Sequence, residues 1–315
     1  MHVSDALVSP AVGIGAGVIA LSLVGLASRF VKENPRKDIV PLMGVLGAFV
    51  FAAQMINFSI PATGSSGHLI GGILLSAILG PWAAFITLSS IIIIQCLFFA
   101  DGGLLAIGCN ILNMAAASCL VAYPLIYRPI AATSLKSWRI MLAAVLSSVI
   151  GLEIGAFGVT LETEFSGVTA LPFYMFLKFM LPIHLVIGLI EGIVTGSLLI
   201  FIAKYSPSII IPEKEISVES DYSPNLKSNK KFYIVCGILT LIFAAGFSVL
   251  ASQNPDGLEW SIDKVGGLAA EEELIPPTAF MPEYNSSFAG IIGSLMVVGV
   301  VWGLSSLIFS KIRAK

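Results

Sequence analysis

The sequence predicts an all-α, polytopic membrane protein, for three reasons. Hydrophobic residues make up 57% of the 315 residues, charged residues only 11%, and the mean hydropathy is +0.95. A soluble domain usually carries about 25% charged residues. The apolar residues also fall into long runs, and about 20 such residues span roughly 30 Å of hydrocarbon as a helix. Finally, the basic residues are confined to alternate connections between these runs.

Nine apolar runs predict about nine transmembrane helices. The third run is short, and Pro81 separates it from the fourth. A short span of this kind is typical of a re-entrant or tilted element near a binding site. The runs lie at about 9–29, 39–57, 68–80, 82–100, 103–127, 138–160, 173–203, 232–252 and 285–310.

The placement of charge predicts the orientation. With the amino terminus outside, every Lys and Arg except Lys178 and Lys264 falls on the cytoplasmic side. The positive-inside rule then favours an N-out, C-in topology, which needs an odd number of spans. Acidic residues gather on the outer side. They form a mouth that attracts cations, or they simply accumulate where basic residues are excluded.

A polar, proline-containing segment at 204–231 divides the chain into two modules. We expect a seven-helix membrane domain at 1–203, a cytoplasmic linker at 204–231 and a two-helix module with an extracytoplasmic loop at 232–315.

The first two residues suggest a metal-binding terminus. A free amine followed by His2 places the Met1 amine nitrogen, the His2 backbone nitrogen and an imidazole nitrogen in fused five- and six-membered chelate rings. Planar nitrogen donation suits Cu(II) or Ni(II), and Co(II) is near them in affinity. We expect Met1 to be retained, because no cleavable signal peptide is evident. The chain has three histidines, and His68, after a loop rich in Gly and Ser, is the candidate fourth ligand. The alternative is that His68 caps a helix.

Further polar residues lie at predicted membrane depth. His184 and Glu191 are seven residues apart on one helix and share a face, where they can interact with Glu153. They form either a buried polar network or a second metal site. The alternative function is therefore an intramembrane metalloenzyme that uses His68, His184 and Glu153 or Glu191.

Several classes of function are excluded by what the sequence lacks. No GxxxxGK[ST] motif occurs, so the chain has no P-loop with which to hydrolyse ATP. The four cysteines form no CxxC pair, which argues against a zinc site or a disulfide framework. No basic stripe indicates nucleic-acid binding.

Four long stretches resemble the CbiM/NikM family, the substrate-binding membrane components of energy-coupling-factor (ECF) cobalt and nickel importers. They are MHVSDALVSP, QMINFSIPATGSSGHLIGGILLSAILGPWAA, QCLFFADGGLLAIGCNILNMA and HLVIGLIEGIVTG, within about residues 1–203. The stretch PDGLEWSIDKVG, from Pro255 to Gly266, resembles the PDGLE domain, a small two-helix component of such importers. Here the two components are fused.

The resemblance implies a seven-helix first module whose amino-terminal segment inserts into the bundle. It also implies that Co²⁺ or Ni²⁺ is held in square-planar fashion by the Met1 amino nitrogen, the His2 backbone and imidazole nitrogens and the His68 imidazole. The metal is a transported substrate, and no prosthetic group is expected. Residues at matching motif positions are expected to shape the site around these ligands: Asn57, Ser65, Ser66 and Gly67.

The resemblance further implies a complex in the cell membrane of a prokaryote. The expected partners are a transmembrane T component of the CbiQ/NikQ type and ATPase subunits of the CbiO/NikO type, which bind from the cytoplasm. The chain itself is then a transport component and not an enzyme. We expect the PDGLE module to load metal or to couple to the transporter, so that deleting 232–315 abolishes uptake and leaves metal binding largely intact.

Overall fold

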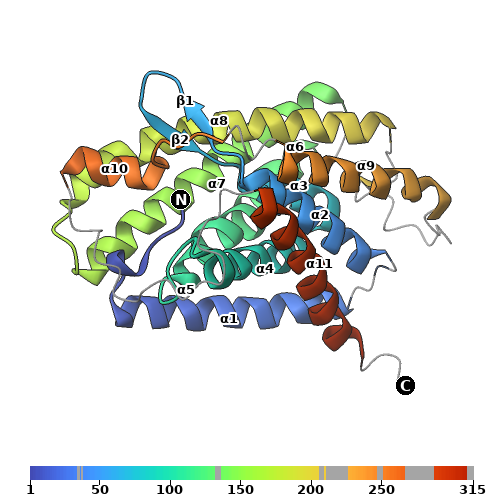
Figure 1. Cartoon of the computed structure of the whole chain (residues 1–315), viewed down its shortest axis with the longest axis horizontal. Helices are drawn as coiled ribbons and strands as arrows, with labels where there is room; N and C mark the ends of the chain where they lie inside the picture. The colour runs from blue at the N-terminus through green and yellow to red at the C-terminus, as the bar shows by residue number, and fades with distance from the viewer. Residues whose placement is uncertain are drawn as a thin grey trace.

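The computed structural model describes residues 1–33, 36, 38–131, 136–205, 209–210, 226–246, 251–266 and 287–310. Within these ranges the chain is almost entirely helical, and its only strands form one short hairpin (Figure 1). The predicted all-α membrane fold is confirmed. Most of the predicted linker and the second half of the outer loop of the C-terminal module lie outside the described residues.

The elements follow one another in this order: η1 (Asp5–Leu7), α1 (Pro10–Glu33), α2 (Ile39–Gln54), β1 (Phe58–Ile60), β2 (Ser65–Gly67), α3 (Gly72–Leu79), α4 (Pro81–Phe99), α5 (Ile107–Asn110), η2 (Ile111–Tyr127), α6 (Arg128–Ala131), α7 (Ser137–Ser166), α8 (Phe173–Tyr205), α9 (Leu226–Ala245), α10 (Gly257–Val265) and α11 (Ser287–Ser310). The segments α5, η2 and α6 form one continuous helix with a π-helical middle part that contains Pro124.

Five of these helices are long and apolar enough to cross a membrane: α1, α4, the continuous helix Ile107–Ala131, α7 and α8. Shorter apolar helices are α2 and the segments Phe232–Ala245 and Phe288–Gly303. The nine-helix count and the N-out orientation remain predictions.

The third predicted run, 68–80, forms a helix only from Gly72 to Leu79. At 1.5 Å per residue this helix is about 12 Å long, less than half the hydrocarbon thickness. It starts after Gly71, whose φ of 77° lies in the left-handed region. It ends at Gly80, φ 81°, which is followed by Pro81 at the first position of α4. Residues 68–71 are therefore a loop.

Helix α4 lies at the centre of the bundle and α1 at its edge. In its most apolar stretch, 78% of α4 is buried inside the protein, against 22% of α1. Helix α1 contacts α5, where Gly108 leaves no room for a Cβ against the backbone of Ala16 and Gly17. The remaining face of α1 carries exposed apolar side chains such as Ile14, Val18 and Leu21, as expected of a surface that faces lipid.

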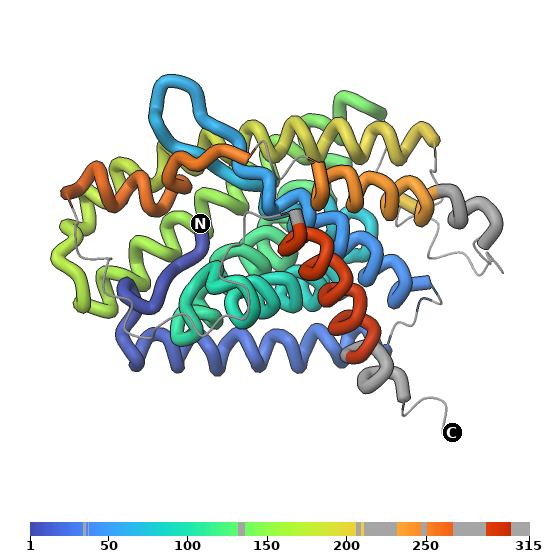
Figure 2. Tube along the Cα trace, viewed as in Figure 1, coloured from blue at the N-terminus to red at the C-terminus, as the bar shows by residue number. Residues whose placement is uncertain are grey.

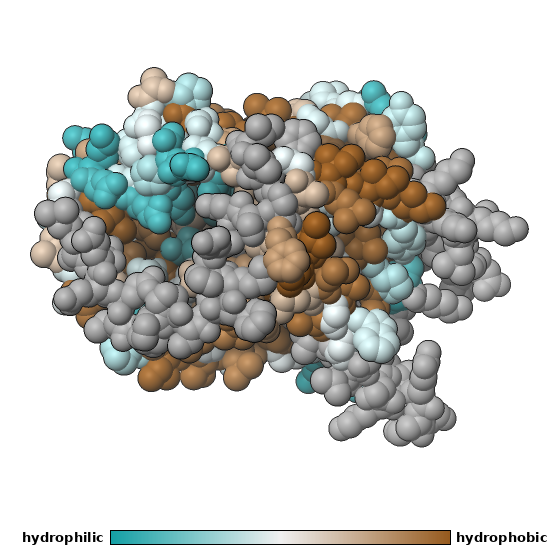
Figure 3. Space-filling view, in the orientation of Figure 1, coloured by the Kyte–Doolittle hydropathy of each residue, from teal (hydrophilic) through white to brown (hydrophobic). Residues whose placement is uncertain are grey.

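The C-terminal module packs against the first module at two places (Figure 1). Helices α9 and α11 cover α2, where the Phe49 and Phe243 rings lie 5.5 Å apart and the Ser294 hydroxyl donates to the carbonyl of Ala48. The segment 251–266, with α10, lies over α8 and the β-hairpin. On the face drawn in Figure 3, polar side chains gather around α10 and the hairpin, whereas α9 presents apolar ones.

Candidate metal centre

The first nine residues, here called the amino-terminal strap, fold back from α1 into the bundle toward α10 (Figure 2). Met1, Val3, Leu7 and Val8 are all buried. The backbone of Val3 pairs with Asn110, which accepts from the Val3 N–H at 2.7 Å and donates to its carbonyl at 3.1 Å. The strap is thus held by both apolar burial and an amide pair that mimics a strand partner.

Asp5 fixes the other end of the strap. Its carboxylate accepts hydrogen bonds from three successive backbone N–H groups, at 2.8 to 3.2 Å. These donors precede α5 and belong to Leu104, Leu105 and Ala106. A carboxylate that collects N–H groups just before a helix stabilises that turn. The strap and the loop after α4 therefore hold each other in place.

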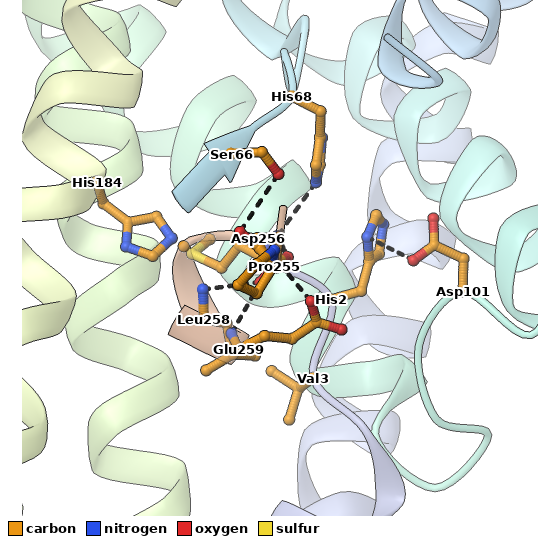
Figure 4. Close-up of polar contacts among 12 residues, drawn as sticks. His2, Val3, Ser66, His68, Asp101, His184, Pro255, Asp256, Leu258 and Glu259 are labelled. Carbon is orange, nitrogen blue, oxygen red and sulfur yellow. Dashed lines mark hydrogen bonds and ion pairs between the residues drawn. The ribbon is translucent and has the colours of Figure 1, made fainter. Parts of the chain in front are cut away.

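The strap brings Met1 and His2 to His68. The Met1 amine nitrogen lies 3.1 Å from His68 Nε2, and the rings of His2 and His68 are stacked, with centroids 5.2 Å apart and planes inclined by 14°. Figure 4 shows both rings in the space between Asp101 and Asp256. The three residues that the sequence singles out as ligands are therefore neighbours in the fold.

His68 is arranged as a nitrogen donor. Burial, the amino-terminal charge and His2 lower the pKa of its imidazole to about 3, so the ring is neutral at neutral pH. Its Nδ1 donates to the carbonyl of Leu69 at 3.2 Å, which leaves the Nε2 lone pair toward the amine. Ile70 and Gly71, which follow His68 in the same loop, donate their N–H groups to the buried carboxylate of Glu191, both at 3.0 Å. These bonds keep 68–71 out of helix α3.

Two carboxylates pair with the candidate ligands. Asp101 Oδ1 lies 2.9 Å from His2 Nδ1, and Asp256 Oδ2 lies 2.7 Å from the Met1 amine. Burial alone would raise the pKa of both carboxyls. The charge and hydrogen bond of His2 lower that of Asp101, and those of the amino terminus lower that of Asp256. In the sequence, both residues are two among several acids of the predicted outer side, and only the Asp101–Gly102 pair and the PDGLE stretch mark them.

A chain of amides links His2 to the loop after His68. His2 Nε2 lies 3.2 Å from Gln95 Oε1, Gln95 donates to Gln54 at 2.7 Å, and Gln54 donates to the carbonyl of Ile70 at 2.8 Å. Because each amide donates to the next acceptor, the oxygen of Gln95 faces His2. The orientation of the His2 ring is thus tied to the position of the His68 loop.

The family described as the cobalt uptake substrate-specific transmembrane region, CbiM, matches residues 2–209, about two thirds of this chain. The chain belongs to the CbiM family. The PDGLE domain matches residues 230–310. As a CbiM member the chain is a multi-pass membrane protein and a transport component, not an enzyme.

Relatives and a solved structure agree with this membership. A putative fused nickel transport protein NikMN of Archaeoglobus fulgidus is 33% identical, and the match covers 97% of this chain and 98% of that one. A putative fused cobalt transport protein CbiMQ of Methanocorpusculum labreanum is 26% identical over 72% of this chain and 40% of that longer protein. A crystal structure described as a truncated transition metal transporter has a TM-score of 0.57 and 31% identity, covering 65% of this chain and 99% of that chain.

In this CbiM protein, three of the four residues expected to surround the site contact the PDGLE-matching module. The carbonyl of Asn57 accepts from the Ser252 N–H at 2.7 Å. Ser66 donates from its N–H to Pro255 and from its hydroxyl to Asn254, both at 2.8 Å. Ser65 is fully buried beside them, and a Cβ at Gly67 would strike Ile187. Asn57, Ser65 and Ser66 thus bind the segment 252–255 beside the candidate ligands, whereas Gly67 packs against α8.

The residues of the metalloenzyme alternative have separate roles in the CbiM fold. His184 Nδ1 donates to the carbonyl of Met180 at 2.8 Å, and Glu191 holds the loop after His68. Glu153 lies on α7, and its Oε1 has no hydrogen bond in the described part of the chain. Among the described residues, no three His, Cys, Asp or Glu side chains are grouped so that they could hold a metal ion. Membership of a family of transport components contradicts an enzyme built on these residues.

Proposed function

We propose that the chain captures Ni²⁺ or Co²⁺ from the outer side of the membrane with the Met1 amine, the His2 backbone and imidazole nitrogens and the His68 imidazole. The observation that carries the proposal is the contact of the Met1 amine with His68 Nε2 at 3.1 Å, beside the stacked ring of His2. Four nitrogen donors suit a planar ion of the Ni²⁺ type, and affinity for Ni²⁺ usually exceeds that for Co²⁺.

Binding requires a change of partners. The six-membered chelate ring needs His2 Nδ1, which Asp101 holds at 2.9 Å. The imidazole therefore turns about its Cβ–Cγ bond when metal enters. The amine and the His2 amide also give up protons to coordinate, so affinity falls as the solution becomes more acidic.

We further propose that the chain is the substrate-binding component of an ECF importer in a prokaryotic cell membrane. The segment 1–203 is its metal-binding domain, 204–231 its cytoplasmic linker and 232–315 its PDGLE module, with the amino terminus outside. Energy then comes from ATPase subunits of the CbiO/NikO type through a T component of the CbiQ/NikQ type. The absence of a P-loop in this sequence and the existence of a fused CbiMQ relative support a multi-component transporter.

Blocking the amino terminus by acetylation tests the proposal directly. Acetylation converts the amine into an amide and removes it from the donor set, so it should abolish Ni²⁺ binding and the planar four-nitrogen absorption band, as should His2→Ala and His68→Ala. His184→Gln is the matched control, since it removes a buried histidine outside the proposed ligand set and should bind Ni²⁺ as the wild type does.

Unchanged affinity in the acetylated protein would rule out the chelate. Cells that contain the T component and ATPase subunits should take up ⁶³Ni with the wild-type chain and not with the His2→Ala variant, and uptake without those subunits would contradict the importer assignment.

A further inference from the structure

Asp256 stands at the junction of the two modules and uses its two carboxylate oxygens for different tasks. Its Oδ1 accepts from the N–H groups of Leu258 and Glu259, at 2.8 and 2.9 Å, and so caps helix α10. Its Oδ2 points away from the helix and lies 2.7 Å from the Met1 amine. The cap fixes the carboxylate, and the fixed carboxylate holds the amine.

The segment that carries Asp256 is itself tightly anchored to the first module. The carbonyls of Asn254 and Pro255 accept from Ser66, and the Trp260 indole donates to the carbonyl of Thr63 at 2.9 Å. Glu259 completes the cap by accepting from the Asp256 N–H at 3.0 Å. Asp256 is therefore placed against the strap by contacts that do not depend on the amine.

The Met1 amine lies between two hydrogen-bond acceptors of different charge. His68 Nε2, at 3.1 Å, offers a lone pair, while Asp256 Oδ2 offers a negatively charged acceptor. The Met1 side chain is only 2% exposed and so anchors the residue inside the protein. The direction of the amine is thus set by the protein.

From this arrangement we propose that Asp256, supplied by the PDGLE-matching module, is the positioning residue for the terminal amine of the metal chelate. The inference rests on the proposed function. An amine that coordinates a metal through its lone pair still carries two hydrogens, and Asp256 Oδ2 accepts one of them. A carboxylate that hydrogen-bonds a metal ligand orients it and raises its basicity, and loss of such a partner typically lowers metal affinity about 10- to 100-fold.

The inference changes the role of the C-terminal module. The module contributes a wall and one hydrogen-bond acceptor to the site, so its removal should weaken metal binding and not only uptake. This differs from the expectation from the sequence, which is that deletion of 232–315 abolishes uptake but leaves metal binding largely intact.

Two substitutions remove the contact and keep the helix cap. Asn and Ser are both good N-cap residues. Asp256→Asn replaces Oδ2 by an NH₂ group, which faces the amine as a second donor. Asp256→Ser has a single side-chain oxygen, which remains with the cap. Glu259→Gln is the matched control, because Gln keeps an acceptor oxygen for the Asp256 N–H and so preserves the cap, while it removes one negative charge from α10 without touching the amine.

The measurements are the Ni²⁺ affinity of the full chain in detergent, on the monodisperse fraction, and the absorption spectrum at saturation. Both Asp256 variants should bind about 10- to 100-fold more weakly, with the wild-type spectrum at saturation, while Glu259→Gln binds as the wild type does. Affinities equal to that of Glu259→Gln would overturn the inference and reduce Asp256 to a helix cap. A changed spectrum would also overturn it, because Asp256 would then be a direct ligand.

The outcome for His68→Ala separates this inference from the proposed function. If His68→Ala binds Ni²⁺ as tightly as the wild type, the chelate itself is wrong, whatever the Asp256 variants do. If His68→Ala loses binding and the Asp256 variants keep it, the chelate stands and the positioning role fails.

Discussion

At the scale of single residues, two buried carboxylates organise the loops around the candidate ligands by binding backbone N–H groups. Asp5 holds the residues before α5, and Glu191 holds Ile70 and Gly71 after His68. A buried charge is costly unless hydrogen bonds satisfy it, and each hydrogen bond to a charged group contributes about 1.5–3 kcal/mol. The backbone donors and the carboxylates therefore depend on each other.

Glu191→Gln should destabilise the protein and weaken metal binding. The amide has one acceptor oxygen, so its NH₂ group faces one of the two N–H donors that the carboxylate now satisfies. An unsatisfied buried donor costs about 1–3 kcal/mol. The loop that positions His68 loosens as a result. Thermal unfolding in detergent and the Ni²⁺ affinity measure the two effects.

Glu153→Gln on α7 is the control for this prediction. It neutralises another carboxyl of the bundle, and the Glu153 Oε1 accepts no hydrogen bond within the described residues. Its stability and affinity should match the wild type. Equal losses in both variants would show that charge, and not the bonds to Ile70 and Gly71, explains the effect.

At the scale of elements, the amino-terminal strap determines whether a ligand site exists at all. Its first residues carry the proposed chelate, and its last residues lead into α1. It is fixed by the amide pair with Asn110, the Asp5 carboxylate and the Gly103 N–H, which donates to the carbonyl of Val3 at 2.9 Å. Apart from the single 3₁₀ turn η1, the strap has no regular structure of its own, so these contacts stabilise it.

Gly103→Ala should displace the strap and abolish tight metal binding. A Cβ at this position would collide with both the backbone nitrogen and the carboxylate of Asp5. Because the Asp5 carboxylate is fixed by three backbone N–H groups, the strap has to move. Ni²⁺ affinity and protease cleavage near the amino terminus report the displacement.

Gly15→Ala adds the same methyl group on the exposed face of α1, where nothing lies within 4 Å of the added Cβ. This variant should keep wild-type affinity. Tight binding by Gly103→Ala would mean that the strap tolerates the shift and that its position is not critical.

At the scale of the whole molecule, the C-terminal module contacts the first module in two places: at the candidate metal site and along helix α2. Helix α11 approaches α2 closely at Gly293, where an added Cβ would strike the fully buried ring of Phe51. The same module supplies Asp256 to the Met1 amine. Docking of α11 and the integrity of the site are therefore properties of one packed unit.

Gly293→Ala should destabilise this docking by about 1–3 kcal/mol, the usual cost of overpacking a core. Gly299→Ala on the same helix is the control, because nothing lies within 4 Å of its added Cβ. Both changes raise helix propensity alike, so a lower unfolding temperature of Gly293→Ala alone measures the steric effect. Identical melting curves would contradict the tight α2–α11 packing.

Much of the fold could be predicted from the sequence because its signals are local. Long apolar runs become long helices, and Pro81 marks the start of α4. The loop 68–71 could not be predicted, since it is kept from extending α3 by Glu191 from a distant helix. The β-hairpin 58–67 was missed for a similar reason: it is steadied by the 251–260 segment.

The residues of the candidate site were likewise only partly predictable from the sequence. Met1, His2 and His68 could be selected from donor chemistry, because an amino-terminal His can form fused chelate rings wherever it lies. Apart from the DG pair and the PDGLE stretch, nothing in the sequence marks Asp101 and Asp256, since a carboxylate is common on any outer loop. Their partners are decided by where the loops are packed.

By itself the sequence determined that this is a helical membrane protein whose terminus can donate several nitrogens to a metal, since hydropathy and donor spacing are properties of neighbouring residues. Its motifs resemble those of the CbiM family. Only the tertiary structure decided which groups surround that terminus. Met1 and Asp256 are 255 positions apart along the chain. Their meeting depends on the burial of the strap and the docking of the C-terminal module, which are properties of the packed chain.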